Sequence, residues 1–335
     1  MNKLVEYKSI YAPYFRGFVE MKQAIGYDVL RIQRIFLEFD RFFISINATD
    51  IIITQEIISR WRESGTCVNN NESTIYTKYS VWAQFCRYMC NLGNQCYIPR
   101  LPKLVRYRFT PYIFTHKQIE EIFLACDSLR ISDRGGSMST VLFIMPAVIR
   151  LLYGTGLRVS EALSLKNEDV DFKNHCILVK KTKNGQQRLA PLSDSLQKVL
   201  EIYVVNRNKM PIKKLDNPES YFFVTPNGLF CHTSRVYDWF RRVLLKCEIP
   251  HLGKGPRVHD LRHTFAVHSL MKLAESSEDL YYVMPILSTY LGHKSVWATE
   301  QYVRLTEEMY PDLLGKQNAV SAYVFPKINE ENEND

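Results

Sequence analysis

Four short groups of arginine, lysine, histidine and tyrosine follow one another in the second half of this 335-residue chain. Together these side chains could transfer a phosphodiester without a metal ion: a phenol attacks phosphorus, guanidinium groups hold the phosphoryl oxygens, and a lysine or histidine moves protons. The groups are Gly156-Leu-Arg158-Val-Ser-Glu161, Lys183 before Asn184-Gly185, His259-Asp-Leu-Arg262, and Leu291-Gly-His293 with Tyr302 nine residues later.

Two of these residues, Arg158 and Arg262, suit the phosphate. The planar guanidinium binds two oxygens at once and keeps its charge. Arg158 has a structural alternative, as a helix cap or an ion-pair partner of Glu161. Glu161 follows Arg158 by three residues, on the same face of a helix. It could therefore orient the guanidinium, or be an ordinary surface residue.

In this order, with a predicted hairpin between them, the groups resemble the signature of tyrosine recombinases, the lambda-integrase-like or phage integrase family of site-specific DNA recombinases. The motifs cover residues 113–310, and residues 1–98 more loosely resemble the family's helical core-binding domain. The stretch from Tyr11-Ala-Pro-Tyr14 to Gly26-Tyr27 is similar to recombinases of transposon-like mobile elements. Each motif alone is frequent in proteins, whereas the ordered set is specific.

The resemblance implies roles for the residues around the phosphate. Arg158 and Arg262 would clamp it, supported by Glu161. His259 would accept the tyrosine proton or bond the phosphate, since imidazole titrates near neutral pH. His293 would donate a hydrogen bond to a non-bridging oxygen.

The same resemblance implies that Lys183 is the general acid for the 5′-oxygen leaving group. The family places this lysine five residues before an arginine of the next strand, here Arg188. Lys180 and Lys181 are competing neighbours, and a simple phosphate contact is the alternative role for Lys183.

Tyr302 is the nucleophile that the resemblance implies, because it has the nine-residue spacing from His293. A phenol with a pKa of about 10 needs a cationic environment to attack at neutral pH. The nearest rivals are Tyr290 and Tyr310. His263 and His268 match no catalytic position of the family, so we expect them to pack or to bond the backbone.

Composition and charge fit a polyanion partner. Hydrophobic residues make up 46% of the chain, which excludes a mostly disordered protein, and the net charge is +8. No apolar run approaches the roughly 20 residues of a membrane span, and no signal peptide is evident, so we expect a soluble, cytoplasmic, nucleoid-associated prokaryotic protein.

The eight scattered cysteines predict buried reduced thiols, with a metal at Cys86 and Cys90 as the minor alternative. No metal-ligand spacing or nucleotide loop occurs, so we expect no cofactor.

The elements that would position these residues are mostly helical. Periodicity predicts four N-terminal helices, at Tyr14 to Ile25, Val29 to Phe43, Thr54 to Glu63 and Ile75 to Leu92, the last capped by Ser73 or Thr74. A capping box at Thr115 and Gln118 opens a helix to about Ser128. Further helices are predicted at 141–153, 196–206, 235–247, 258–274, 280–291 and near 299–308.

Three short strands are predicted at 170–172, 177–182 and 187–191, with Asn184-Gly185 as the hairpin turn. The fold class is therefore mainly α with a small antiparallel β-sheet (α+β). We expect a helical DNA-binding domain at 1–98, a basic linker at 99–114, a catalytic domain at 115–325 and an acidic tail at 326–335.

The linker alternates basic and aromatic residues and contains no acidic residue. This pattern is typical of a segment that follows the phosphate backbone of a nucleic acid, and equally of a solvated linker. The expected DNA contacts are Arg100, Lys103, Arg106, Arg108 and Lys181.

The implied activity is site-specific cleavage and rejoining of double-stranded DNA through a 3′-phosphotyrosyl intermediate, for integration or excision of a mobile element. A homo-tetramer on paired sites would act, alone or with related recombinases, and the apolar segment from Glu307 to Phe325 would dock on a neighbouring subunit or pack in cis. Two alternatives are a non-catalytic DNA-binding accessory subunit and a type IB topoisomerase.

Overall fold

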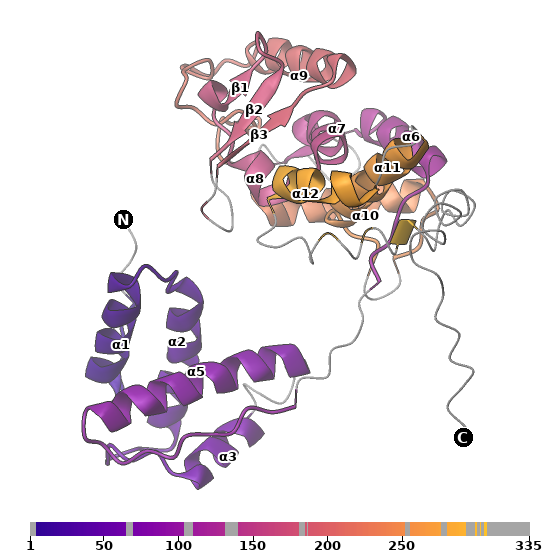
Figure 1. Cartoon of the computed structure of the whole chain (residues 1–335). Helices are drawn as coiled ribbons and strands as arrows, with labels where there is room; N and C mark the ends of the chain where they lie inside the picture. The colour runs from indigo at the N-terminus through magenta and orange to yellow at the C-terminus, as the bar shows by residue number, and fades with distance from the viewer. Residues whose placement is uncertain are drawn as a thin grey trace, which may run out of the picture. The chain divides into compact units, whose positions relative to one another are not determined.

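The computed structural model describes residues 5–64, 70–103, 110–130, 140–180, 185, 187–251, 255–275, 280–292, 299, 302, 305 and 306. The chain divides into two compact units, residues 1–109 and 110–335. Each unit has its own hydrophobic core. Figure 1 shows the helical first unit and the second unit, in which the small sheet and α9 lie at one end and α11 and α12 at the other.

Unit 1 contains the four predicted helices, with ends that differ from the prediction by at most three residues. They are α1 (Ala12–Ala24), α2 (Leu30–Ser45), α3 (Gln55–Glu63) and α5 (Glu72–Asn91). The predicted cap of α5 was wrong, because Asn71 caps it by accepting a hydrogen bond from Thr74 N at 2.8 Å. The core is aromatic, and Phe39 stacks on Trp82 with ring centroids 4.0 Å apart.

Unit 2 is mainly helical, as predicted. Its helices are α6 (His116–Asp127), η2 (Leu142–Ile144), α7 (Met145–Thr155), α8 (Val159–Leu163), η3 (Asn167–Asp169), α9 (Asp194–Arg207), α10 (Thr233–Lys246), α11 (Asp260–Glu275) and α12 (Leu280–Leu291). The capping box is confirmed, since Thr115 accepts from Gln118 N and the Gln118 side chain accepts from Thr115 N. α7 contacts α6, α9 and α11, so it lies at the centre of the unit.

The sheet is antiparallel, as the hairpin pattern predicted. Strands β1 (Val170–Asp171), β2 (Cys176–Val179) and β3 (Arg188–Pro191) lie in the order β1-β2-β3. In the pairing of β2 with β3, Arg188 lies opposite Val179, and this is the residue pair nearest the hairpin turn. Gly185 of the predicted turn has a φ of +74°, a conformation that glycine adopts without strain. Residues 181–184 and 186 lie outside the described residues.

The cysteines differ in part from the prediction. Seven are free, at positions 86, 90, 96, 126, 176, 231 and 247. Cys86, Cys126 and Cys231 are buried, but Cys90, one residue before the end of α5, is exposed. Cys67 lies outside the described residues.

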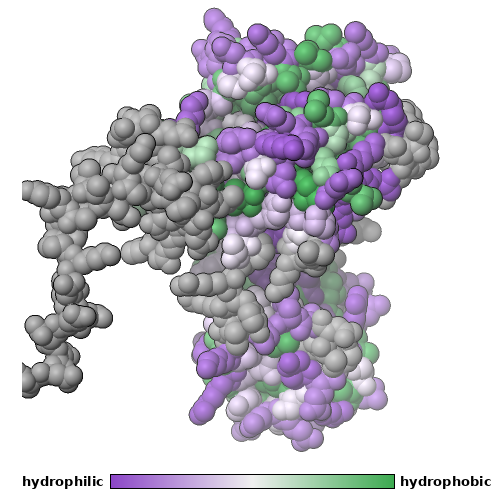
Figure 2. All heavy atoms as spheres, turned by 90° about the vertical axis from the view of Figure 1, so that its right-hand side faces the viewer, coloured by the Kyte–Doolittle hydropathy of each residue, from purple (hydrophilic) through white to green (hydrophobic). Residues whose placement is uncertain are grey.

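The described helices include none that is long and apolar enough to cross a membrane. On the face shown in Figure 2, hydrophobic residues lie in small groups between hydrophilic ones. Such a mixture is ordinary for a protein surface in contact with water.

Mild acid should destabilise unit 2 through His268, which is 7% exposed and lies 2.9 Å from the Tyr153 hydroxyl. Burial, together with the charge of nearby His116, lowers the pKa of His268 to about 4, against 6.5 for the free side chain. The unfolded chain therefore takes up a proton that the folded chain resists. The free energy of unfolding should fall as the pH drops from 6.5 towards 4, with about 2 kcal/mol lost between pH 7.5 and pH 5.

Urea unfolding at both pH values tests this prediction. Between pH 7.5 and pH 5, the free energy of unfolding of His268→Gln should fall by about 2 kcal/mol less than that of the wild type. The control His175→Asn replaces an exposed ring at a residue with positive φ, which asparagine tolerates, and should keep the wild-type pH dependence. The same pH dependence in all three proteins would contradict the assignment.

Candidate active site

A tight turn after α7 positions Arg158. Gly156 ends α7 with a φ of +62°, and its N–H bonds Leu152 O. A Cβ atom there would lie 2.5 Å from Cδ1 of Phe265, so the turn requires glycine for both its conformation and its space. Arg158 follows in an extended conformation and directly precedes α8. Its side chain thereby projects from the junction between two helices.

The Glu161 carboxylate joins two arginines. Its Oε1 lies 2.7 Å from Nη1 of Arg158, and its Oε2 lies 2.7 Å from Nη2 of Arg188. Oε2 also accepts a hydrogen bond from the backbone N–H of Arg158 at 3.0 Å. Glu161 is 1% exposed. The carboxylate therefore orients the Arg158 side chain, and a plain surface role for Glu161 is excluded.

Two opposing effects act on the pKa of Glu161. Burial raises it, but the hydrogen bonds from Arg188 and Arg158 and the charge of Arg188 outweigh burial and hold the pKa below its usual value. Glu161 is therefore ionised at neutral pH, as a partner of two cations must be.

Arg188 enters the site from the start of β3. A Cβ atom at Gly292, which follows α12, would lie 3.1 Å from Nη1 of Arg188. Gly292 thus lets the backbone before His293 approach the guanidinium closely. Sequence reasoning used Arg188 only to select Lys183 and missed its place in the site.

Arg262 is fixed by the ends of two helices. It is 2% exposed, and its Nη1 and Nη2 donate to Gly156 O at 2.8 Å and to Leu291 O at 2.6 Å. The carbonyl end of a helix carries a partial negative charge, which suits a cation. Burial first, and then the charge of Arg158, lower the pKa of Arg262 to about 10, so it remains charged at neutral pH.

His259 lies just before α11, beside the arginines. Burial, followed by the charges of Arg262 and Arg158, lowers its pKa to about 4. The ring is therefore neutral at pH 7, when it can accept one hydrogen bond and donate another.

Tyr302 is buried, at 1% exposure, in a small hydrophobic cluster with residues of α11 and α12. Its Oη lies 2.9 Å from Nδ1 of His263. The His263 ring also meets the His259 ring edge to face, with centroids 4.9 Å apart. The prediction that His263 only packs or bonds the backbone was wrong, because α11 turns its Nδ1 towards the phenol.

The other candidates fall into two groups. Lys180, the described rival of Lys183, forms ion pairs with Glu168 and Asp169, both at 2.8 Å, which raise its pKa and hold its ammonium there. Among the rival tyrosines, Tyr290 stacks on Phe265, and its pKa is raised to about 12 by burial.

Six of the predicted or rival residues lie outside the described residues, namely Lys181, Lys183, His293, Arg106, Arg108 and Tyr310. Arg100 and Lys103 are described and exposed.

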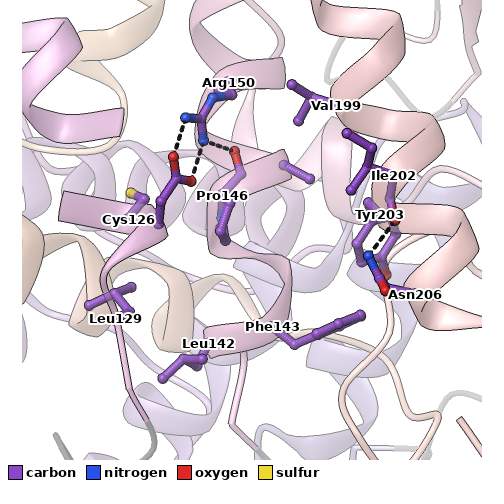
Figure 3. Close-up of a pocket in the computed structure, with 12 residues that line it drawn as sticks. Cys126, Leu129, Leu142, Phe143, Pro146, Arg150, Val199, Ile202, Tyr203 and Asn206 are labelled. Atoms are coloured by element: carbon purple, nitrogen blue, oxygen red, sulfur yellow. Dashed lines mark hydrogen bonds and ion pairs between the residues drawn. The ribbon is translucent and has the colours of Figure 1, made fainter. Parts of the chain in front are cut away.

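Among the described residues, no three His, Cys, Asp or Glu side chains form a group that could hold a metal ion. A separate pocket of about 450 Å³ lies between α6, α7 and α9, and Figure 3 shows Phe143, Ile202 and Tyr203 at its walls. The catalytic candidates do not line it.

The amino-acid sequence of this chain is similar to those of known proteins. The sequence model of the phage integrase family matches residues 113–309, more than half of the chain. The putative integrase/recombinase y4rB of Sinorhizobium fredii is 28% identical over 305 residues, 89% of this chain and 93% of that protein. Tyrosine recombinase XerC of Bacillus subtilis is 29% identical over 240 residues, 70% of this chain and 71% of that protein.

Solved structures share the fold. The Tn1549 transposon integrase in complex with circular intermediate DNA has a TM-score of 0.61 at 19% identity, covering 86% of this chain and 94% of that chain. A lambda integrase dimer bound to a core site has a TM-score of 0.60 at 15% identity, covering 87% and 94%.

Glu161→Gln should destabilise the second unit, because it leaves two neighbouring arginines without their shared anion. Removing one partner of a buried ion pair costs about 3–5 kcal/mol, and the partial exposure of Arg158 places our expectation near the lower end. Urea unfolding measures the loss. The control Glu168→Gln removes an exposed pair with Lys180 and should cost less than about 1 kcal/mol. Equal losses in the two variants would overturn the assignment.

Proposed function

This chain belongs to the phage integrase family of tyrosine recombinases, and from that membership we propose that it is a site-specific DNA recombinase. It cuts and rejoins double-stranded DNA through a 3′-phosphotyrosyl intermediate, for the integration or excision of a mobile element. The observation that carries the proposal is the convergence of Arg158, the pair His259 and Arg262, and Tyr302, from three separate parts of the chain, on one site.

Each described residue has a role that its surroundings suit. Arg158 and Arg262 bind the non-bridging oxygens and stabilise the charge that grows in the transition state, and their fixed positions mean that little reorganisation is needed. Glu161 acts as a positioning residue for Arg158. His259, neutral beside the guanidinium groups, bonds the phosphate, and the oxygen of Tyr302 attacks phosphorus.

Two further roles fall to residues outside the described part of the chain. Lys183 protonates the 5′-oxygen as it leaves. His293 donates a hydrogen bond to a non-bridging oxygen, and its neighbour Gly292 supports this role by bringing the backbone close to Arg188. The phosphotyrosyl ester keeps the energy of the broken bond, so resealing needs no nucleotide and no metal.

The division of labour between the units follows the sequence. Residues 1–98 form a helical DNA-binding domain, 99–114 a basic linker, 115–325 the catalytic domain and 326–335 an acidic tail. Contacts to DNA phosphates come from Arg100, Lys103, Arg106, Arg108 and Lys181. The exposure of Arg100 and Lys103 supports this assignment, as do the solved relatives whose names describe complexes with DNA.

The active assembly is a tetramer on paired sites, each bound by two protomers, formed by this chain alone or with related recombinases. The apolar segment from Glu307 to Phe325 docks on a neighbouring subunit. The protein acts in the cytoplasm, at the nucleoid, where its DNA lies.

Covalent trapping tests the reaction. Protein and nicked duplexes from the DNA that flanks its gene are mixed without metal, and the products are separated by denaturing electrophoresis. The wild type should give an adduct that survives denaturation. Tyr302→Phe should give none, because it lacks the attacking oxygen, while the control Tyr290→Phe should give the wild-type amount.

An adduct that persists in Tyr302→Phe, or is lost in Tyr290→Phe, would refute the assignment of the nucleophile. Specific binding without any adduct would favour a non-catalytic accessory subunit. Relaxation of supercoiled plasmid that lacks a specific site would favour a type IB topoisomerase.

Salt dependence tests the linker. The double variant Arg100→Gln and Lys103→Gln should bind DNA with a plot of log affinity against log salt that is shallower by about 2, since each phosphate contact contributes about 0.9. An unchanged slope, measured by fluorescence anisotropy, would show that the linker is only solvated.

A further inference from the structure

The contact between His263 and Tyr302 has no role in the assignments above. Tyr302 must lose its phenolic proton as its oxygen attacks phosphorus, and a phenol with a pKa of about 10 holds that proton at neutral pH. Nδ1 of His263 lies 2.9 Å from the Tyr302 Oη, within the reach that proton transfer requires. The contact therefore joins the attacking atom to a group that can accept its proton.

His259, the residue expected from sequence to take this proton, has a different environment. It lies four residues before His263, and its pKa responds to the charges of Arg262 and Arg158. The two rings meet edge to face at 4.9 Å. Of the two histidines, His259 therefore lies beside the phosphate-binding guanidinium groups and His263 beside the nucleophile.

The contact is supported on both sides. On α11, the Thr264 hydroxyl donates to Asp260 O at 2.8 Å and accepts from the backbone N–H of Phe114 at 3.0 Å. The neighbouring Arg262 is bonded to the ends of α7 and α12. Tyr302 packs in one apolar cluster with Ala266 of the same helix. Nδ1 and Oη are thus held by rigid neighbours, as a catalytic pair requires.

We propose that His263 is the general base of strand cleavage, an inference that rests on the proposed function. Its Nδ1 accepts the phenolic proton when the ring carries its own proton on Nε2. As the bond from the Tyr302 oxygen to phosphorus forms, the bond from phosphorus to the 5′-oxygen breaks. The electron pair leaves with that oxygen, which takes a proton from Lys183. On resealing, His263 returns its proton to Tyr302.

Single-turnover cleavage of a nicked duplex tests the proposal. His263→Ala should cleave about 10²–10³ times more slowly than the wild type, within the range that general bases contribute. Its DNA affinity should be unchanged, and added imidazole should restore at least a tenth of the lost rate. His263→Gln, which can hydrogen bond but cannot take up a proton, should be equally slow and provides a second variant if the alanine protein does not fold.

Two comparisons isolate the role of the base. The control His268→Gln changes a different histidine of α11, which bonds Tyr153 instead, and should cleave at the wild-type rate. A duplex with sulfur in place of the 5′-oxygen needs no proton on its leaving group. It should therefore rescue Lys183→Ala but not His263→Ala.

Three results would overturn the inference. They are a rate for both His263 variants within threefold of the wild type, a slow rate that imidazole does not improve, and rescue of His263→Ala by the sulfur substrate. In each case an adduct that still depends on Tyr302 would leave the proposed function intact. Absence of any adduct from the wild type would instead refute the proposed function itself.

Discussion

The rest of the site depends on one buried anion, the carboxylate of Glu161. Two guanidinium groups that approach the same point of a protein interior repel each other and lose their hydration. Glu161 offsets both effects, with one oxygen on Arg158 and the other on Arg188. Arg158 and Arg188 are thereby held on the same carboxylate, and Arg188 lies close to the backbone at Gly292. A single side chain therefore links the turn after α7 to the start of β3.

Arg262 makes the complementary connection through the backbone. It donates to Gly156 O at the end of α7 and to Leu291 O at the end of α12, two carbonyls that lie far apart in the chain. These groups would be left without partners at a helix end, so the arginine satisfies them as well as binding charge. Arg262 is thus part of what holds the two helices in place. Its position is set by the fold before any DNA binds.

Local signals made much of this predictable. The capping box at Thr115 and the three-residue spacing of Arg158 and Glu161 each act within a few residues, and both features are present. The pairing of β2 with β3 followed from the same kind of signal. The contact of His263 with Tyr302 was missed because it spans 39 residues and depends on how α11 is rotated. The sequence held one hint that His263 belongs to the site: it follows His259 by four residues, a spacing that places both rings on one helical face.

The small hydrophobic cluster around Tyr302 has a thermodynamic consequence. Proteins open in separate cooperative units, and each unit opens at a cost set by the apolar contacts that it loses. Tyr302 and Leu305 belong to a cluster distinct from the main core of the second unit. Glu161, Arg158 and Arg188 do not belong to this cluster. The apolar contacts around Tyr302 and the ion pairs of Glu161 are therefore separate groups of interactions, and one group can weaken while the other stays formed.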